Sequence, residues 1–404
     1  MAYFNLHSAK DAKKDEFYTQ LEDIQAELKN YIDKFKDKVV FCNCDDPFES
    51  NFVKYFLMNF NRLGLKELIA TGYKTSPFGG TEIGSVNNPY VLRVKSTSKY
   101  LIGTQKDLDI AGAKYFLKTE GANVMMPLIG NEALDENGDK IQVLVKETYL
   151  DEGTGKQKSK TVKQDLYYEA GDFRSNMSIE LLKESDIVVT NPPFSLFREF
   201  VSTLIKYEKQ FLIIGSMNAI TYKEIFPLIK ENKAWLGNGF KGNVGFFKSP
   251  YSDTATSSQH IIGKIRVSNV IWFTNIDHTK RHIMLPLDLG YTYYGHEEMY
   301  PKYDNYDAIN VDKTSEIPCD YKGVMGVPIT FLDKYCPEQF EILGCTANPE
   351  YNSVEKKDRS KKAIQLIKEG RLIGAKCVGG NSNIYIDSDN YVHVIYHRIL
   401  IRKK

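Results

Sequence analysis

The residues best suited to chemistry form one continuous tetrapeptide: Asn191, Pro192, Pro193 and Phe194. The apolar run DIVVT at 186–190 precedes it and predicts a buried strand, and the apolar spacing over 196–207 predicts a helix after it. In open α/β sheets, ligands bind at the carboxyl ends of the strands. The tetrapeptide therefore stands where a substrate would bind. A sequence of this type arises by chance in such a chain only a few times in a thousand, roughly.

The tetrapeptide suits methyl transfer to an amine conjugated with a ring, such as N6 of adenine. That nitrogen is a poor nucleophile because its lone pair is delocalised into the ring. If the Asn191 side-chain oxygen and the Pro192 carbonyl each accept one N–H, the nitrogen approaches a tetrahedral geometry and its lone pair points at a sulfonium methyl held in line. The two acceptors also stabilise the positive charge that develops on the nitrogen, so no strong general base is needed.

The remaining residues of the tetrapeptide have supporting roles. Two successive prolines fix the backbone and remove N–H donors that would compete for the same space. Phe194 can stack on the substrate base. The alternative interpretation is a proline-rich turn that ends a buried strand, with Asn191 only capping the next helix.

Alternating helices and strands must position this site. Helical patterns cover 11–35, 51–63, 178–183 and 196–207, and apolar runs predict strands at 38–44, 67–71, 186–190 and 211–216. Strand, turn, helix and strand within about 30 residues is a βαβ unit. We therefore expect an α/β fold with parallel strands in an open sheet.

Two stretches of the chain depart from this alternation. We interpret 73–168 as an insertion in the crossover between sheet strands, partly a β-hairpin with its tip at 151–160. After Trp235 the segments become β-rich, with strands expected at 244–248, 260–267, 269–274 and 391–401. A boundary between the catalytic sheet and an accessory region is expected between about 250 and 290.

The sequence resembles the EcoRI-type family of DNA adenine-specific N6-methyltransferases, which use S-adenosylmethionine. The resemblance covers most of 12–72 and 170–237, is weaker over about 300–345 and does not cover the insertion. It rests on the segments KKDEFYTQLEDIQAEL (13–28), VVFCNCDDPFESNFVKYF (39–56), GDFRS (171–175), DIVVTNPPFSLFREFV (186–201) and MGVPITFLDKY (325–335).

The resemblance implies a fold and a division of the chain. The fold would be a Rossmann-like S-adenosylmethionine-dependent methyltransferase sheet of seven strands. The catalytic domain would span 1–275, with 73–168 inserted in it. A β-rich C-terminal region at 276–404 would bind DNA and recognise the target, together with the insertion.

Carried over residue by residue, the resemblance also implies which residues bind the cofactor. The N-terminal cofactor segment would be Phe17, Tyr18 and Thr19, and the adenine-binding step would be Asp172 and Phe173. The first cofactor loop would consist of Asn43, Cys44, Asp45, Asp46 and Pro47, and the catalytic residues would be Asn191, Pro192, Pro193 and Phe194.

Three positions depart from the broader methyltransferase pattern. Gln20 stands where many related enzymes have proline, and the first loop lacks the usual glycines. No acidic residue ends the 67–71 strand, where an acceptor for the ribose hydroxyls commonly sits, so Asp45 or Asp46 is a candidate for that role. Asp172 precedes an expected helix and could instead be an N-cap.

Adenine N6 is paired inside a DNA duplex, so the target base must be rotated out of the stack. Charge is uneven along the chain: 285–350 holds twelve acidic and four basic residues, whereas 354–404 holds twelve basic and five acidic ones. This asymmetry suggests a region that faces DNA, and a solvated charged surface is the alternative. The candidate phosphate contacts are Lys156, Lys158, Lys160, Lys356, Lys357 and Arg359.

Composition excludes several other classes of protein. Lys and Arg number 53 against 52 Asp and Glu, so a uniformly basic nucleic-acid coat is excluded. The six cysteines form no CxxC pair, which favours a reducing, cytoplasmic setting. The N-terminal segment lacks the apolar core of a signal peptide, and no apolar stretch reaches the roughly 18 residues that a membrane span needs. Neither kind of membrane-directing segment is therefore expected. Histidine pairs at a spacing of four do not make a metal site without a third ligand, so no metal is expected.

We therefore expect a site-specific DNA adenine N6-methyltransferase that uses S-adenosylmethionine. It would be the modification enzyme of a restriction–modification system that acts on double-stranded DNA, with a separately encoded restriction endonuclease as a possible partner. A monomer would suffice if the target is methylated one strand at a time, and a dimer is the alternative. A fused nuclease is not expected, because no Pro-Asp plus Glu-x-Lys constellation is present. The alternatives are an N-methyltransferase of RNA adenine or protein glutamine, and a catalytically idle DNA-binding scaffold.

Overall fold

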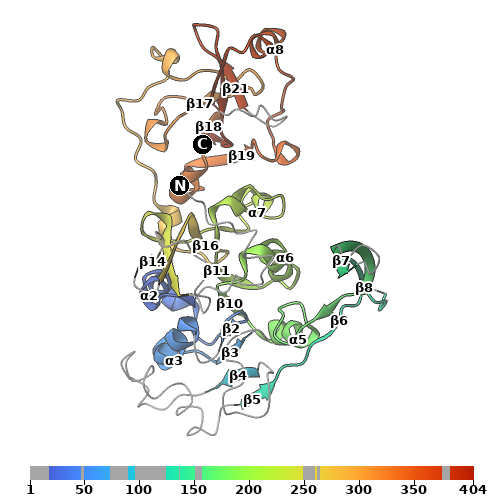
Figure 1. Ribbon diagram of the computed structural model, residues 1–404. Helices are drawn as coiled ribbons and strands as arrows, with labels where there is room; N and C mark the ends of the chain where they lie inside the picture. Colours follow the sequence, from blue (N-terminus) through green and yellow to red (C-terminus); the bar gives the residue numbers. More distant parts are fainter. Residues whose placement is uncertain are drawn as a thin grey trace.

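The structure is a computed structural model that describes residues 18–46, 50–72, 90–95, 124–135, 137–150, 157–248, 260–261, 264–374 and 383–404. Its centre is a mixed sheet of eight strands in the order β12-β16-β11-β10-β2-β3-β4-β5, with helices on both faces (Figure 1). The protein is thus of the α/β type that the sequence predicts. Within the described ranges, no helix is both long enough and apolar enough to cross a membrane.

The four neighbouring strands in the middle of this main sheet run parallel: β11 (Gln210–Ser216), β10 (Ile187–Thr190), β2 (Val39–Cys42) and β3 (Glu67–Thr71). All residues of β2 and β10 are buried, which explains their continuous apolar sequences. Antiparallel pairing continues the sheet on both sides through β16 (Val270–Thr274), β12 (Trp235–Leu236), β4 (Tyr90–Val94) and β5 (Val124–Pro127).

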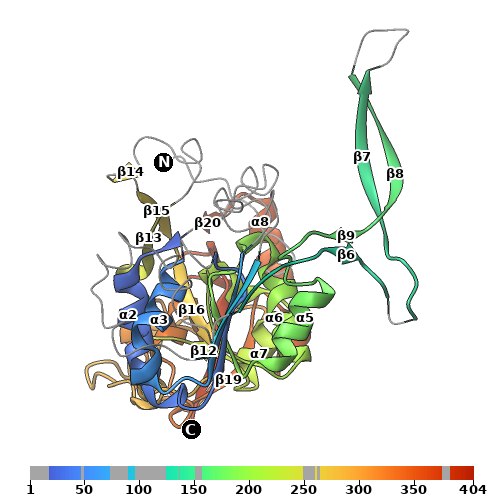
Figure 2. The same ribbon diagram turned by 90° about the horizontal axis from the view of Figure 1, so that it is seen from below.

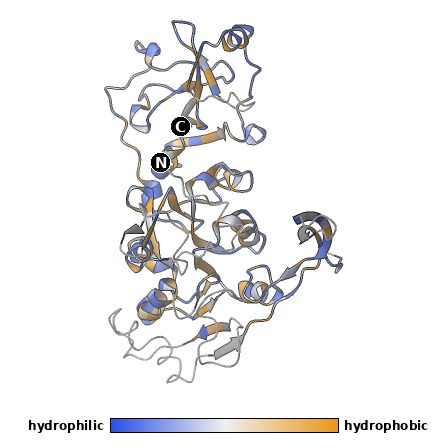
Figure 3. Ribbon diagram, in the orientation of Figure 1, coloured by the Kyte–Doolittle hydropathy of each residue, from blue (hydrophilic) through white to orange (hydrophobic). Residues whose placement is uncertain are grey.

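Helices cover both faces of the main sheet. On one face lie α2 (Leu21–Leu28) and α3 (Asn51–Leu63), and on the other lie α5 (Asn176–Glu184), α6 (Phe197–Lys206) and α7 (Phe226–Lys230) (Figure 1). Successive strand residues point to opposite faces. Val40 therefore packs in the same cluster as Phe56 of α3, whereas Phe41 packs in the cluster of Phe200 on α6. Figure 3 shows the hydrophobic residues concentrated along the central strands.

Helix α3 spans the residues that the sequence predicts, because both of its ends carry clear signals. Ser50 is its N-cap, and its Oγ accepts a hydrogen bond from the Phe52 amide at 3.1 Å. Gly64 ends the helix in the left-handed conformation, with φ of 63°, which glycine adopts without a Cβ penalty. The helix therefore begins directly after the loop that follows β2.

Besides the main sheet, the described residues form three further sheets of three or four strands. One, in the order β1-β13-β15-β14, consists of β1 (Tyr18–Thr19), β13 (Val244–Lys248), β15 (Lys264–Ser268) and β14 (His260–Ile261). The C-terminal part of the chain contains a sheet of β17 (Ile309–Asn310), β18 (Met325–Pro328), β23 (Arg398–Lys403) and β19 (Phe340–Cys345). It also contains a sheet of β20 (Leu372–Gly374), β22 (Val392–Ile395) and β21 (Asn383–Ile386), against which α8 (Lys361–Lys368) packs.

Short 3-10 helices connect these elements. They are η1 (Lys29–Lys34), η3 (Phe194–Leu196), η4 (Met217–Thr221), η5 (Lys241–Asn243), η7 (Thr279–His282), η8 (Glu297–Met299), η9 (Thr314–Glu316), η10 (Ile329–Lys334) and η11 (Pro349–Tyr351).

A long β-hairpin projects from the body of the protein (Figure 2). It consists of β7 (Gln142–Leu150) and β8 (Gln157–Asp165), which pair in register over nine residues each. The short strands β6 (Asn131–Glu132) and β9 (Tyr167–Tyr168) pair at its base. The hairpin that the sequence predicts within 73–168 is confirmed, and β8 already starts at Gln157, inside the predicted tip.

Several expectations from the sequence are wrong in detail. The main sheet has eight strands rather than seven, and two of them, β4 and β5, come from the expected insertion. The expected strand at 391–401 is two strands, β22 and β23, in different sheets, and the one at 260–267 is β14 and β15. The helix expected at 11–35 begins only at Leu21, because Tyr18 and Thr19 form β1, and it continues as the 3-10 helix η1. Residues 11–17 lie outside the described ranges.

Candidate active site at the carboxyl end of the sheet

The tetrapeptide follows the last residue of β10, as the sequence predicts. Pro192 is buried, and Asn191, Pro193 and Phe194 are half-buried. Phe194 opens η3 and packs against the hydrophobic cluster on the α3 side of the sheet. Helix α6 starts within one turn of it, so a strand and a helix hold the tetrapeptide from both ends.

The order of the strands marks this point as the expected ligand crevice. From β2 the chain passes through α3 to β3 on one side of β2, and later from β10 through α6 to β11 on the other side. The two crossover helices lie on opposite faces of the sheet (Figure 1). The order therefore reverses between β2 and β10, and open sheets bind ligands beyond the carboxyl ends of the strands at such a point.

The expected first cofactor loop follows β2 on the other side of this crevice. Asn43, Asp45 and Asp46 are buried and Cys44 is half-buried, while Pro47 lies outside the described residues. The Asp45 amide donates to the carbonyl of Thr71, at the end of β3, over 3.0 Å. The loop is thus attached to the carboxyl end of the neighbouring strand.

The Asp45 carboxylate connects this loop to the tetrapeptide. Its Oδ1 accepts a hydrogen bond from Ser50 Oγ at 2.6 Å, and its Oδ2 accepts one from Thr190 Oγ1 at 2.5 Å. Thr190 is the residue before Asn191. Burial raises the pKa of Asp45 to about 7; the hydrogen bonds from Ser50 and Thr190 act in the lowering direction, and the nearby Asp46 raises it further.

The expected N-terminal cofactor segment also lies at this edge. Tyr18 and Thr19 form β1, and the Thr19 carbonyl accepts a hydrogen bond from the Asn51 side chain at 2.7 Å. Asn51 is the first residue of α3, next to Ser50. The structure therefore brings Tyr18, Thr19, the first loop and the tetrapeptide together. Phe17 lies outside the described residues.

Two buried hydroxyls at this edge have no hydrogen-bond partner in the described part of the chain. They are Oγ1 of Thr19 and Oγ1 of Thr71. Thr19 is 3% exposed and Thr71 is fully buried. Buried polar atoms normally have partners, so these oxygens are suited to a polar ligand.

Asp172 and Phe173 lie beside α6, but their side chains contact the protein itself. Both carboxylate oxygens of Asp172 accept from the Arg174 guanidinium, at 2.8 and 2.9 Å, and Arg174 also pairs with Glu199 of α6 at 2.7 Å. Phe173 is 4% exposed and packs edge-on against Phe200, with ring centroids 5.0 Å apart. The N-cap of α5 is Ser175 rather than Asp172, so the capping alternative for Asp172 is wrong.

A buried carboxylate holds α2, the helix that follows Thr19. Glu27 is 1% exposed and accepts hydrogen bonds from the Tyr31 hydroxyl at 2.9 Å and from the amides of Asn238 and Gly239 at 2.8 and 3.0 Å. Burial raises the pKa of Glu27 above its usual value. This carboxylate therefore connects α2 to the loop after β12.

Replacing Glu27 with alanine should destabilise the protein, because the amide donors of Asn238 and Gly239 then lose their buried acceptor. We expect a loss of about 1–3 kcal/mol of unfolding free energy for each donor, measured by urea denaturation. Glu22 is exposed on the same helix and serves as the control, with little change expected for Glu22→Ala. Equal stability of the two variants would contradict the role given to Glu27.

The candidate DNA contacts are in two separate places. Lys158 and Lys160 are on β8, opposite Tyr149 and Glu147, and Lys156 lies outside the described residues. The second group directly precedes α8, where Lys357 is exposed and Lys356 and Arg359 are half-buried. Figure 2 shows the hairpin and α8 on the same side of the molecule.

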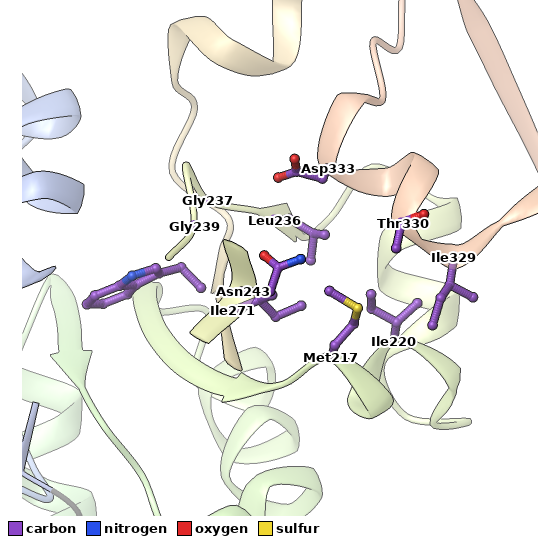
Figure 4. A pocket seen from close by; sticks show the side chains of 11 residues that line it. Met217, Ile220, Leu236, Gly237, Gly239, Asn243, Ile271, Ile329, Thr330 and Asp333 are labelled. Atoms are coloured by element: carbon purple, nitrogen blue, oxygen red, sulfur yellow. The ribbon is translucent and has the colours of Figure 1, made fainter. Parts of the chain in front are cut away.

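Other features of the molecule do not add to the site. Among the described residues, no group of three or more His, Cys, Asp or Glu side chains could hold a metal ion. A small cavity lies between the main sheet and η10 (Figure 4), and no residue of the tetrapeptide lines it. Its lining is largely apolar and includes Met217, Ile220, Leu236, Ile271, Trp272 and Ile329.

The site also contains residues that the sequence interpretation missed. Ser50, Thr71 and Thr190 each place a hydroxyl at the carboxyl edge of the sheet. A cap signal before the 51–63 helix could have identified Ser50. The roles of Thr71 and Thr190 depend on strand order, which no local signal gives.

Comparison with known proteins identifies relatives over most of the chain. The family described as "Adenine-specific methyltransferase EcoRI" matches residues 5–404. The Type II methyltransferase M.EcoRI of Escherichia coli is 45% identical over 84% of this chain and 88% of its own length. The Type II methyltransferase M.MpnI of Mycoplasma pneumoniae is 36% identical over 86% of this chain and 87% of its own. No solved structure matches the chain.

Proposed function

Because the chain belongs to the family of EcoRI-type adenine-specific methyltransferases, we propose that it is the modification enzyme of a type II restriction–modification system. It transfers a methyl group from S-adenosylmethionine to N6 of an adenine that is rotated out of duplex DNA. The observation that carries this proposal is the tetrapeptide at the end of β10, joined through Thr190 to Asp45 in the loop after β2.

We propose that the main sheet is a Rossmann-like methyltransferase sheet. The parallel order β3-β2-β10-β11, with crossover helices on opposite faces, supports this assignment. We also propose that the catalytic domain spans 1–275, with 73–168 inserted in it, and that the region 276–404 recognises the target. The separate β-sheets formed by β17 to β23 support a distinct role for that region.

The residues at the crevice fit S-adenosylmethionine as the cofactor. The two buried hydroxyls of Thr19 and Thr71, which have no partner in the described part of the chain, are suited to its polar groups. We assign cofactor binding to the N-terminal segment with Phe17, Tyr18 and Thr19, to the loop from Asn43 to Pro47, and to Asp172 and Phe173. When bound, the cofactor supplies an electrophilic methyl group on a sulfonium sulfur.

The chain's own residues position and activate the adenine. The Asn191 side-chain oxygen and the Pro192 carbonyl accept the two N–H groups of N6, which turns the nitrogen lone pair outward and stabilises the charge that develops there. Pro193 keeps the backbone rigid at this point. Phe194 stacks on the extruded base.

We propose that the hairpin and the segment before α8 contact the DNA backbone. Lys158 and Lys160 lie in the first residues of β8, and Lys156 is close to them in sequence. Lys356, Lys357 and Arg359 precede α8, which lies on the same side of the molecule as the hairpin (Figure 2). Phosphate contacts of this kind hold a protein in register on the duplex. We expect the protein to act as a monomer, alongside a separately encoded endonuclease.

The double variant Lys158→Gln/Lys160→Gln should bind duplex DNA with a weaker salt dependence. Each lost phosphate contact lowers the slope of log affinity against log salt by about 0.9, so we expect a decrease of roughly 2. Fluorescence anisotropy over a salt series measures it. Lys36 and Lys66 are exposed near the amino ends of β2 and β3, and their double glutamine variant is the control. If the slope of log affinity against log salt is equal in the two variants, these hairpin lysines do not contact DNA phosphates.

Product analysis separates this function from its rivals. Purified protein should place labelled methyl on adenine in duplex DNA and not on RNA or on protein glutamine. Label in RNA or protein would retain the amine chemistry but replace the substrate. Cofactor binding without transfer to any acceptor would indicate a catalytically idle DNA-binding scaffold.

A further inference from the structure

The hydrogen bonds of the Asp45 carboxylate are to other residues of the protein, so its oxygens are already occupied before a ligand binds. Asp45 is 5% exposed, and each of its oxygens already accepts a hydrogen bond from a protein hydroxyl, Ser50 on one side and Thr190 on the other. Asp45 connects four elements. It follows β2, which ends at Cys42, and its amide binds the end of β3. Its carboxylate binds Ser50, which caps α3, and Thr190, which ends β10.

These contacts form a continuous path from the cofactor side of the crevice to the tetrapeptide. The Asn51 side chain binds the Thr19 carbonyl, its neighbour Ser50 binds Asp45, and Asp45 binds Thr190, which precedes Asn191. A shift at any step moves Asn191 relative to the loop after β2. Displacements of about 1 Å from a productive geometry can cost roughly 100-fold in rate.

We propose that Asp45 is a positioning residue for methyl transfer, whose carboxylate fixes the end of β10 to the loop after β2 and so sets the position of Asn191 relative to the cofactor. This inference rests on the proposed function and deepens it. It assigns to Asp45 a role different from direct cofactor contact, which the resemblance implies for this residue.

The ionised form of Asp45 is the one that fits the geometry. A carboxylate accepts from both hydroxyls, whereas a protonated carboxyl can accept on only one of its oxygens without reorienting a partner. Because burial raises the pKa of Asp45 to about 7, the positioning contact should form as pH rises through 7. Among the described residues, the ionisable side chains that act on Asp45 are Asp46 on the same loop and Cys42 on β2.

The decisive variant is Thr190→Val, which removes the hydroxyl and keeps the shape of the side chain. We expect kcat for DNA methylation to fall about tenfold or more, while the dissociation constant for S-adenosylmethionine changes less than about threefold. Thr190→Ser retains the hydroxyl and should recover most of the rate. The double variant with Asp45→Asn should be no slower than the slower single variant, because both changes remove one interaction.

Thr274→Val is the matched control. Thr274 is also fully buried, ends β16 of the same sheet and donates to a backbone carbonyl, that of Phe211, at 2.7 Å. Phe211 is near the amino end of β11, so this threonine lies at the opposite edge of the sheet. Thr274→Val should lower the melting temperature as Thr190→Val does, and leave kcat per folded molecule unchanged.

The pH profile of the unchanged protein tests the inference independently of the Thr190 variants. In the unchanged protein, kcat should rise between about pH 6 and pH 8, and Asp45→Asn should flatten the profile. Folded Asp45 retains its proton above its usual value near 4, so stability should fall as pH rises from about 4 to 7, and this part of the fall should vanish in Asp45→Asn.

The outcomes separate this inference from the proposed function. If the unchanged protein transfers no methyl group to DNA, the proposed function fails. If it does, but Thr190→Val has the same kcat as Thr274→Val, or the pH profile of kcat is flat in the unchanged protein, Asp45 has a purely structural role and the inference is overturned.

Discussion

Replacing Asn191 with alanine should lower methyl transfer to duplex DNA by on the order of 100-fold or more. The residue follows β10 directly and is half-buried at the edge of the crevice. In the proposed function, its side-chain oxygen accepts an N–H of the adenine amine, and this interaction strengthens as positive charge develops on the nitrogen. The loss therefore falls on the transition state, and single-turnover transfer of labelled methyl measures it.

Cofactor binding distinguishes this effect from general damage to the site. Asn191→Ala should bind S-adenosylmethionine within about threefold of the unchanged protein, since the lost acceptor serves the substrate. Asn59 is a half-buried asparagine of α3 whose side chain donates to the Tyr55 carbonyl at 2.8 Å, and Asn59→Ala is the control. Equal losses of rate and cofactor affinity in Asn191→Ala would remove Asn191 from its proposed role.

Replacing Phe194 with alanine should weaken the hold on the extruded base by about 1–3 kcal/mol, which corresponds to roughly five- to 150-fold in kcat/KM for DNA. An aromatic ring can stack on any base, because every base presents a π-face. The loss is measured with duplex substrates, under conditions where the cofactor is saturating.

Two further variants separate stacking from packing, because Phe194 also packs against the hydrophobic cluster on the α3 side of the sheet. Phe194→Tyr keeps the ring and should retain most of the activity. Phe194→Leu keeps apolar packing and should preserve the melting temperature while losing stacking. Full activity of Phe194→Leu would show that the ring does not stack on the substrate.

Local patterns in the sequence predict the elements that hold the site. The strand DIVVT and the helical spacing after it place the tetrapeptide at a strand end, because both signals are contained within about 20 residues. Likewise, helix α3 begins and ends at the predicted residues, since Ser50 and Gly64 are strong local signals at its ends.

Long-range pairing explains what the sequence does not predict. Strands β4 and β5 have no local feature that distinguishes an insertion from the edge of the main sheet. The pairing of β4 with β3, and of β5 with β4, decides it. The link between Asp45 and Thr190 joins residues 145 positions apart, so only the parallel pairing of β2 and β10 brings them together. The hydrogen bonds from the Arg174 guanidinium to the Asp172 carboxylate depend on the geometry of both side chains. The spacing of the residues in the sequence does not predict that geometry.

The most direct test of the account is transfer of labelled methyl from S-adenosylmethionine to unmethylated duplex DNA, followed by mapping of N6-methyladenine at single-base resolution. We predict label at one adenine within a single short sequence, and its loss in Asn191→Ala. Label on another base, on RNA or on protein, or equal labelling by Asn191→Ala, would contradict the account.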